Sequence, residues 1–262
     1  MANVPQIIVA TPPESLRGAA RPDCVIAHMA YRIGHGFRLY RHHSLHGICG
    51  GMMVLDTGGF KGGGPLSALI ADITDECARK DFAGIVLDAG LNPRSPAQLS
   101  ISKALASAAR PLGLKYFVPE ALAHTGEDTI VRVSSALSGG TLRRHIADAF
   151  EKYGADRVAL ELQRVNMDFT LPAFRGVGKK LTDEELTELM SRHNAAAQFS
   201  AELVVNYFTY RDETDAHFVL YDNAQSFRRK IKAAARAGVQ HALLFYPHVA
   251  GIYDEILRAE SS

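Results

Sequence analysis

Carboxylate side chains stand at or near the ends of several apolar segments of this sequence. Asp56, Asp88 and Glu120 come at the end of such segments, and Glu161 lies close to the end of another. One protonated and one ionised carboxyl group are what general acid and base catalysis needs, for example in cleaving a glycosidic bond. We take Asp88, Glu161 and Glu120 as candidate catalytic residues.

Other kinds of site have less support. His42, His43 and His46 cluster in RHHSLH, but neither HxH nor HExxH spacing frames them, so we expect a loop surface and no metal site. The glycines of GGFKGGG, residues 58–64, form no GxGxxG turn. This segment is either a flexible loop over the site or, with Lys61, a nest of N–H groups that cradles an anion. No cofactor is expected.

A barrel is the scaffold that would bring these carboxylates together. Eight short apolar runs recur, most of them separated by segments of helical period: Gln6 to Ala10, Cys24 to Ala30, Met52 to Asp56, Gly84 to Asp88, Lys115 to Pro119, Arg157 to Leu162, Glu202 to Tyr207 and His241 to Tyr246. Strands and helices alternating in 262 residues predict the α/β class, as one (β/α)₈ TIM barrel domain over residues 1–262. A doubly wound open sheet is disfavoured because its glycine-rich phosphate signals are missing.

Helix signals support this scaffold. Ser95 before Pro96 marks one helix start, and Thr182 three residues before Glu185 has capping-box spacing. The last strong helix is expected from about Gln225 to Ala237, with its basic residues, including Lys230, on a solvated face. The stretch from Arg164 to Leu181 is long for a connection, which favours a lid or wall of the pocket.

Strand alternation predicts which polar groups face the barrel lumen. In residues 84–90, Val86 and Asp88 point inward and the other aliphatics outward, and the same pattern turns Glu161 and Gln163 inward. Because the strand ends of a barrel meet at one rim, Asp56 and Glu120 are expected to converge there too. The alternative is that Asp88 and Glu161 are held by neighbours such as Gln163 and do no chemistry.

Composition limits the partners and the compartment. Lys plus Arg number 29 against 28 for Asp plus Glu, so net charge gives no argument for a nucleic-acid partner or an anionic membrane. Three cysteines are too few for a disulfide framework. No signal peptide and no apolar run of spanning length is apparent, so we expect a cytoplasmic protein without membrane insertion. Oligomeric state is left open.

Several segments resemble glycoside hydrolase family 18, in particular its bacterial branch of spore-cortex and cell-wall enzymes. Tyr207 to Pro247 is similar to the family's hairpin, helix and last strand, with a small hairpin near 207–222. MMVLDTGGF resembles the SxGG strand, AGIVLDAG the DGxDxDxE strand, and DRVALELQR the MxYD strand, in that order. The resemblance implies a (β/α)₈ barrel with a pocket for an N-acetylated sugar.

The departures fall on the residues that work in that family. Asp88 matches the third acidic position of the DGxDxDxE strand, but Gly90 stands where the resemblance implies the proton-donating Glu. Loss of a general acid costs about 10²- to 10⁴-fold in rate, so chitinase-type activity should be severely reduced. Phe245 replaces a Trp on which the sugar stacks, and can still offer a smaller ring.

Three functions follow from these patterns. The favoured one is a barrel that has lost catalysis and binds an N-acetylated glycan, a muropeptide or a protein partner at its mouth. The second is an active glycosidase, acting on N-acetylated sugars, whose acid has moved to Glu161 or Glu120. The third is a non-catalytic assembly or scaffold protein. Four residues are the candidates for substrate binding: Asp56, Gln163, Tyr210 and Phe245.

Overall fold

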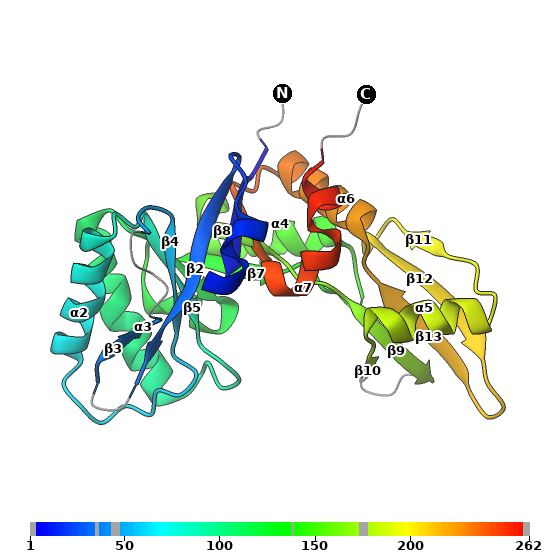
Figure 1. Ribbon diagram of the computed structural model, residues 1–262, viewed down its shortest axis with the longest axis horizontal. Coiled ribbons are helices and arrows are strands. Elements are labelled where there is room, and N and C mark those ends of the chain that lie inside the picture. The colour runs from blue at the N-terminus through cyan, green and yellow to red at the C-terminus, as the bar shows by residue number, and fades with distance from the viewer. Residues whose placement is uncertain (1–3, 35–36, 43–47, 138, 173–177, 259–262) are drawn as a thin grey trace.

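Eight parallel strands close into a barrel in the computed structural model, which describes residues 4–34, 37–42, 48–137, 139–172 and 178–258 (Figure 1). The barrel strands, in chain order, are β1 (Gln6–Thr11), β2 (Cys24–Ile33), β4 (Met52–Asp56), β5 (Gly84–Asp88), β6 (Lys115–Pro119), β7 (Ile130–Ser134), β8 (Val158–Leu162) and β14 (His241–Phe245). β1 pairs in parallel with both β2 and β14, which closes the sheet. The predicted (β/α)₈ barrel is confirmed.

Helices cover the outside of this barrel. They are α1 (Leu16–Ala19), α2 (Leu66–Arg79), α3 (Pro96–Ala109), α4 (Leu142–Tyr153), α6 (Ala224–Ala237), α7 (Tyr246–Val249) and α8 (Tyr253–Leu257). Between β6 and β7 the chain forms only a 3₁₀ segment, Glu120–Thr125, and between β2 and β4 it forms β3 (Leu39–Arg41), which pairs antiparallel with β2. No helix within the described ranges is both long and apolar enough to cross a bilayer.

Local signals in the sequence correctly place three helix ends. Ser95 accepts a hydrogen bond from the backbone N–H of Gln98 at the start of α3. Thr182 and Glu185 form the predicted capping box, and Gly238 ends α6 with a φ of 88°, a left-handed conformation that glycine adopts without a Cβ penalty.

The alternation within the strands divides the core into an inner and an outer part. Val86 packs inside the barrel with residues such as Phe117 and Leu243, whereas Ile85 and Leu87 face α2 and α3. The predicted inward direction of Val86 is therefore correct. A strand buried on both faces must be apolar on both, which is why these runs are nearly continuous in the sequence.

One of the eight predicted runs is wrong, and one barrel strand was not predicted. Residues Ile130–Ser134 form β7, although the sequence reading included no strand there. The run from Glu202 to Tyr207 belongs to no barrel strand, because β12 (Val205–Arg211) lies in a separate antiparallel sheet. The number of barrel strands was therefore correct although one member of the set was not, and β7 is short and carries an Arg and a Ser on its inner side.

The separate sheet is inserted between β8 and α6 and lies beside the barrel in Figure 1. Its other strands are β9 (Asn166–Leu171), β10 (Lys179–Lys180), β11 (Gln198–Ser200) and β13 (Ala216–Tyr221), in the order β10-β9-β13-β12-β11. Helix α5 (Asp183–Arg192) covers one face. The expected long loop from Arg164 to Leu181 is thus wrong in part, because β9 and β10 occupy much of it.

A buried ion pair joins this insertion to the barrel. Lys230 of α6 lies 2.7 Å from Oδ2 of Asp222, and both side chains are almost completely buried. The same carboxylate accepts hydrogen bonds from the backbone N–H of Val165 and from the hydroxyl of Ser226. Lys230 was expected on a solvated face, and this is wrong because α6 turns that position towards the point where the insertion begins and ends.

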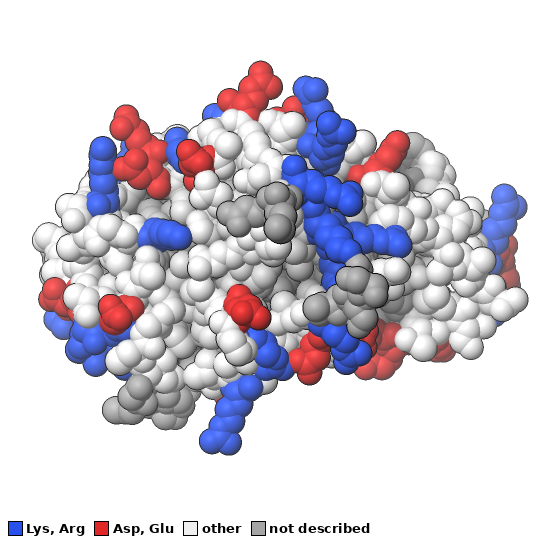
Figure 2. Space-filling view, turned by 90° about the horizontal axis from the view of Figure 1, so that it is seen from above, with Lys and Arg blue, Asp and Glu red and all other residues white. Residues whose placement is uncertain are grey.

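The remaining basic residues of α6 lie at the surface. Arg228, Arg229, Lys232 and Arg236 are exposed or half-buried, and Arg229 stacks over the Phe199 ring at 4.0 Å. Lys and Arg side chains form a band across the middle of the face seen in Figure 2. Helix α6 therefore keeps one polar face, with Lys230 as the exception.

His241, the first residue of β14, is expected to make the stability of the protein depend on pH. Burial lowers the pKa of His241 to about 4, assisted by the charge of Lys115, and its ring packs against Phe117. An unfolded histidine takes a proton near pH 6.5. Between these values the unfolded state binds more protons, so the free energy of unfolding should fall as the pH drops from 6.5 towards 4, by about 3 kcal/mol from this residue.

Urea unfolding of the wild type and of His241→Leu at intervals from pH 7 to 4.5 measures this effect. The variant should lose much of the slope, whereas His124→Leu, at an exposed position, should keep it. Parallel pH profiles for wild type and His241→Leu would show that His241 is not the source.

Candidate functional site

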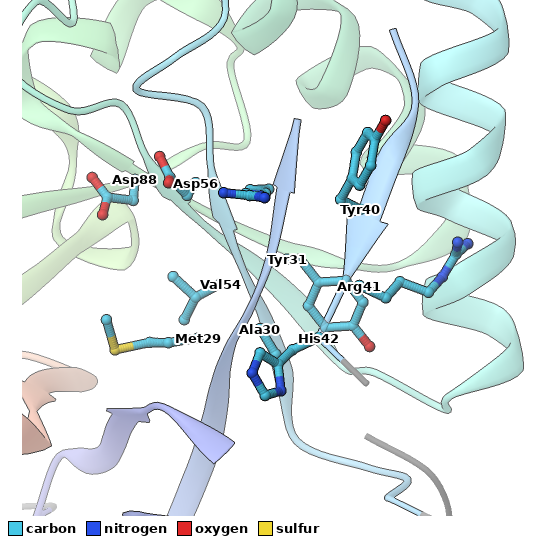
Figure 3. Close-up of a pocket in the computed structure, with 10 residues that line it drawn as sticks. Met29, Ala30, Tyr31, Tyr40, Arg41, His42, Val54, Asp56 and Asp88 are labelled. Carbon is cyan, nitrogen blue, oxygen red and sulfur yellow. The ribbon is translucent and has the colours of Figure 1, made fainter. Parts of the chain in front are cut away.

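Two carboxylates lie together at the C-terminal ends of the barrel strands, which we call the barrel mouth. Asp56 and Asp88 are directly opposite each other in the register of β4 and β5. They line a cavity of about 530 Å³ that extends to β2 and β3, and Figure 3 shows them above Met29 and Val54. The other lining residues are Ala30, Tyr31, Arg32, Tyr40, Arg41 and His42.

Both carboxylates are held by short backbone turns. Asp56 Oδ1 accepts the N–H of Gly58 at 2.8 Å, and Asp88 Oδ1 accepts the N–H of Gly90 at 3.1 Å. Each aspartate therefore has one oxygen engaged by its own turn, and no residue that the structure describes donates a hydrogen bond to the other. This arrangement suits hydrogen bonding to hydroxyl or amide groups of a ligand.

A buried polar pair fixes the two turns to each other. Thr57 donates its backbone N–H to the carbonyl of Asp88 at 2.8 Å, and its hydroxyl lies 2.7 Å from Oε1 of Gln98. The side-chain amide of Gln98 returns a hydrogen bond to the carbonyl of Thr57. Neither residue was predicted, because nothing in the spacing links Thr57 to a glutamine in the first turn of α3.

The turn at Gly90 has no room for a side chain. Gly90 has a φ of 61°, and a Cβ built on it would lie 2.7 Å from the Cα of Gly58. Real Cβ atoms essentially never approach another heavy atom this closely. A residue other than glycine at position 90 would require a shift of the backbone, and the left-handed conformation would be strained as well.

Glu161 points into the lumen, as predicted, but is held by neighbours. Its Oε2 lies 3.1 Å from Arg132, and its Oε1 accepts a hydrogen bond of 2.7 Å from the Gln163 amide. Arg132 also donates to the carbonyl of Leu87 on β5 at 2.7 Å, and Ser134 donates to Gln163 at 2.9 Å. Glu161 and Gln163 therefore belong to a polar network that crosses the barrel just below its mouth.

Arg132 is the centre of this network and was missed in the sequence. Its guanidinium is buried, and its Nε has no hydrogen-bond partner in the structure. The residue lies on β7, the strand that was not recognised. An arginine followed two residues later by a serine, in a short apolar segment, was the available signal for a polar inner face.

Glu120 does not join the other carboxylates, so its expected convergence on the rim is wrong. It begins the 3₁₀ segment after β6 and accepts a hydrogen bond of 2.9 Å from Tyr153, with Lys152 at 3.6 Å. Both partners belong to the end of α4. Pro119 is the last residue of β6, so the chain has already turned outward at Glu120.

Tyr210 also lies away from the cavity that holds Asp56 and Asp88. It packs on the α5 side of the inserted sheet, donates to Asp168 at 2.7 Å and stacks on His217. Burial opposes the charged form of His217, but hydrogen bonds to Asp168 and Asp212 raise its pKa overall. These contacts describe a cluster that secures α5 to its sheet.

Phe245 and the histidine segment complete the predicted set. Phe245 ends β14 and packs against the inner core, so its ring is on the lumen side of the barrel. His42 lines the mouth cavity, whereas His43 and His46 lie outside the described residues. Among the residues that are described, no group of three or more His, Cys, Asp or Glu side chains is arranged to hold a metal ion.

Comparison with known proteins identifies the fold. Neither a family model nor a curated protein sequence matches the chain. Among solved structures, the spore cortex-lytic enzyme SleL of Bacillus cereus matches with a TM-score of 0.65 and 13% identity, over 100% of this chain and 76% of that one. A chitinase of Chromobacterium violaceum matches with a TM-score of 0.61 and 15% identity, over 97% and 100% of the two chains.

A plant enzyme extends this comparison. The family GH18 chitinase of Cycas revoluta, solved in complex with allosamidin, matches with a TM-score of 0.58 and 13% identity, over 96% of this chain and 97% of that one. Identities this low establish similarity of fold alone. The chain therefore has a (β/α)₈ barrel fold of the kind found in glycoside hydrolase family 18.

Proposed function

We propose that this protein binds a carbohydrate, either an N-acetylated glycan or a cell-wall fragment, at the barrel mouth and lacks chitinase-type catalysis. The observation that carries the proposal is the mouth cavity, where Asp56 and Asp88 each offer a free carboxylate oxygen. Sugar hydroxyl and acetamido groups are donors for such oxygens. The structural neighbours named above include a chitinase and a cortex-lytic enzyme, which supports a glycan as the ligand class.

The surroundings of the other carboxyl groups favour binding over a relocated acid. A general acid must carry a proton and reach the leaving oxygen. Glu161 forms an ion pair with Arg132, and an ionised carboxylate is only a hydrogen-bond acceptor. Glu120 faces α4. Position 90 carries no side chain. These three facts support a mouth that retains recognition without the acid that hydrolysis requires.

Isothermal titration calorimetry with chitotetraose and with a muropeptide tests the binding. Asp88→Ala should weaken the Kd of whichever ligand binds by about tenfold or more, because hydrogen bonds to charged groups are the stronger kind. Asp75→Ala removes a carboxylate from the exposed side of α2 and should leave the Kd unchanged. The absence of binding to both ligands, with a normally folded protein, would refute the proposal.

Incubation of the wild type with chitotetraose, followed by chromatography of the products, tests the loss of catalysis. We expect no products above the rate of a buffer blank. Turnover that disappears in Glu161→Gln, with an unchanged melting temperature, would instead establish the relocated acid. A defined oligomer or protein complex that is insensitive to Asp88→Ala, without glycan binding, would favour the scaffold function.

A further inference from the structure

A second cavity, of about 520 Å³, adjoins the mouth cavity and has a different chemical character. The two cavities share Arg32, Tyr40 and Asp56 as lining residues. The second is otherwise lined by the chain between β2 and β3 and by the glycine-rich loop after β4: Ile33, Gly34, Phe37, Gly59, Phe60, Lys61 and Gly62. A ligand that occupies the first cavity can therefore extend into the second.

Aromatic contacts build the walls of this second cavity. Phe37 and Phe60 meet edge to face with ring centroids 5.5 Å apart, which joins the two segments that line the cavity. The Phe37 ring also covers the backbone of Gly64, and the Tyr40 ring covers Gly34, at positions where a Cβ would collide with the rings. The absence of side chains at these two glycines is what allows the rings to pack.

The second cavity contains two cationic side chains that differ from the other cations near this strand end. Arg38 and Arg41, near the same strand end, are paired with Asp72 and Glu76 at 2.9 and 2.8 Å. Arg32 and Lys61, by contrast, form no hydrogen bond or ion pair with any residue that the structure describes. Arg32 is even opposite Asp56 in the register of β2 and β4, and the two side chains still do not pair.

We propose that Arg32 and Lys61 bind an anionic group of the glycan, so that the ligand is an acidic rather than a neutral oligosaccharide. This inference rests on the proposed function. Its physical basis is that Asp88 lines only the first cavity and can accept from hydroxyl and amide donors there, while Lys61 lines only the second and, with the shared Arg32, can receive a carboxylate or phosphate. Arginine presents paired N–H donors that match either anion, and lysine adds a flexible point charge.

Binding of three related disaccharides tests the inference: a disaccharide of N-acetylglucosamine and N-acetylmuramic acid, its methyl ester, and N,N′-diacetylchitobiose 6-phosphate. The free acid should bind about 5- to 10-fold more tightly than the ester, as expected for charge-assisted hydrogen bonds at an exposed site. If the phosphate also binds more tightly than the ester, the site is a general anion site. If only the acid does so, the site is specific for a carboxylate.

Variants of Arg32 and Lys61 test whether these two cations cause the tighter binding of the acid. Arg32→Gln and Lys61→Gln should each bring the ratio of the two Kd values, ester to acid, close to 1, whereas Arg32→Lys should keep part of the preference for the acid. Lys103→Gln, on the exposed face of α3, is the matched control. Equal affinities for acid and ester would overturn this inference alone. Failure of all three ligands, and of chitotetraose and the muropeptide as well, to bind would instead refute the proposed function.

Discussion

Replacing the buried Lys230 with Met is expected to lower the free energy of unfolding by about 3–5 kcal/mol. The substitution leaves the carboxylate of Asp222 buried without its cation, 2.7 Å from where the ammonium was. The hydrogen bonds from Val165 and Ser226 remain, but they do not neutralise the charge. Val165 immediately precedes the first strand of the inserted sheet and Asp222 immediately follows its last strand. Loss of the ion pair should therefore loosen the insertion first.

Urea unfolding monitored by circular dichroism measures this change. Lys232→Met, two residues further along α6 and exposed, should change the free energy of unfolding by no more than about 0.5 kcal/mol. Lys230→Met with Asp222→Asn should recover part of the loss, because the uncompensated charge is gone. Equal stability of Lys230→Met and the wild type would contradict the importance of this ion pair.

Introducing a carboxyl group at the barrel mouth by Gly90→Glu is expected to destabilise the protein without creating hydrolysis. The left-handed conformation at position 90 costs a side chain about 1–2 kcal/mol, and the collision with Gly58 adds to it, for a total on the order of 3 kcal/mol. The backbone must move to accept the new Cβ. Since Asp88 and Asp56 are held by the same pair of turns, both carboxylates should be displaced.

Two further variants separate the causes. Gly90→Ala should show most of the destabilisation, because the Cβ alone produces the collision. Gly59→Glu places the same carboxylate in the neighbouring loop, after β4, where a Cβ has no heavy atom within 4 Å, and should be nearly neutral in stability. Thermal unfolding and product analysis with chitotetraose give the two readouts. A stable Gly90→Glu variant that cleaves the substrate would refute the argument.

This expectation bears on the proposed function. A mouth that had merely lost its glutamate by substitution should regain some activity when the glutamate is returned. Here the turns after β4 and β5 approach each other so closely that a Cβ at position 90 would collide with the backbone of Gly58. The packing of these turns therefore supports a mouth adapted to recognition.

The features that depend on local pattern could be predicted from the sequence alone. Continuous apolar runs predicted seven of the barrel strands in the right places, and capping residues such as Ser95 and Thr182 marked helix starts correctly. Period-two alternation gave the inward direction of Val86 and Glu161. Each of these signals lies within a few residues of the feature it predicts, so one sequence is enough to read it.

Which polar groups contact each other depends on the tertiary structure and could not be predicted from the sequence. Arg132 and Glu161 are 29 positions apart, and Gly58 and Gly90 are 32 apart, and no spacing rule connects either pair. The pattern of α6 places Lys230 on a solvated basic face, but in the fold it pairs with the buried Asp222. Glu120 follows an apolar strand as a rim carboxylate would, but the chain turns outward after Pro119. The physical reason is that strand pairing and side-chain packing bring distant residues into contact, and the energy of a charged or glycine position depends on those contacts.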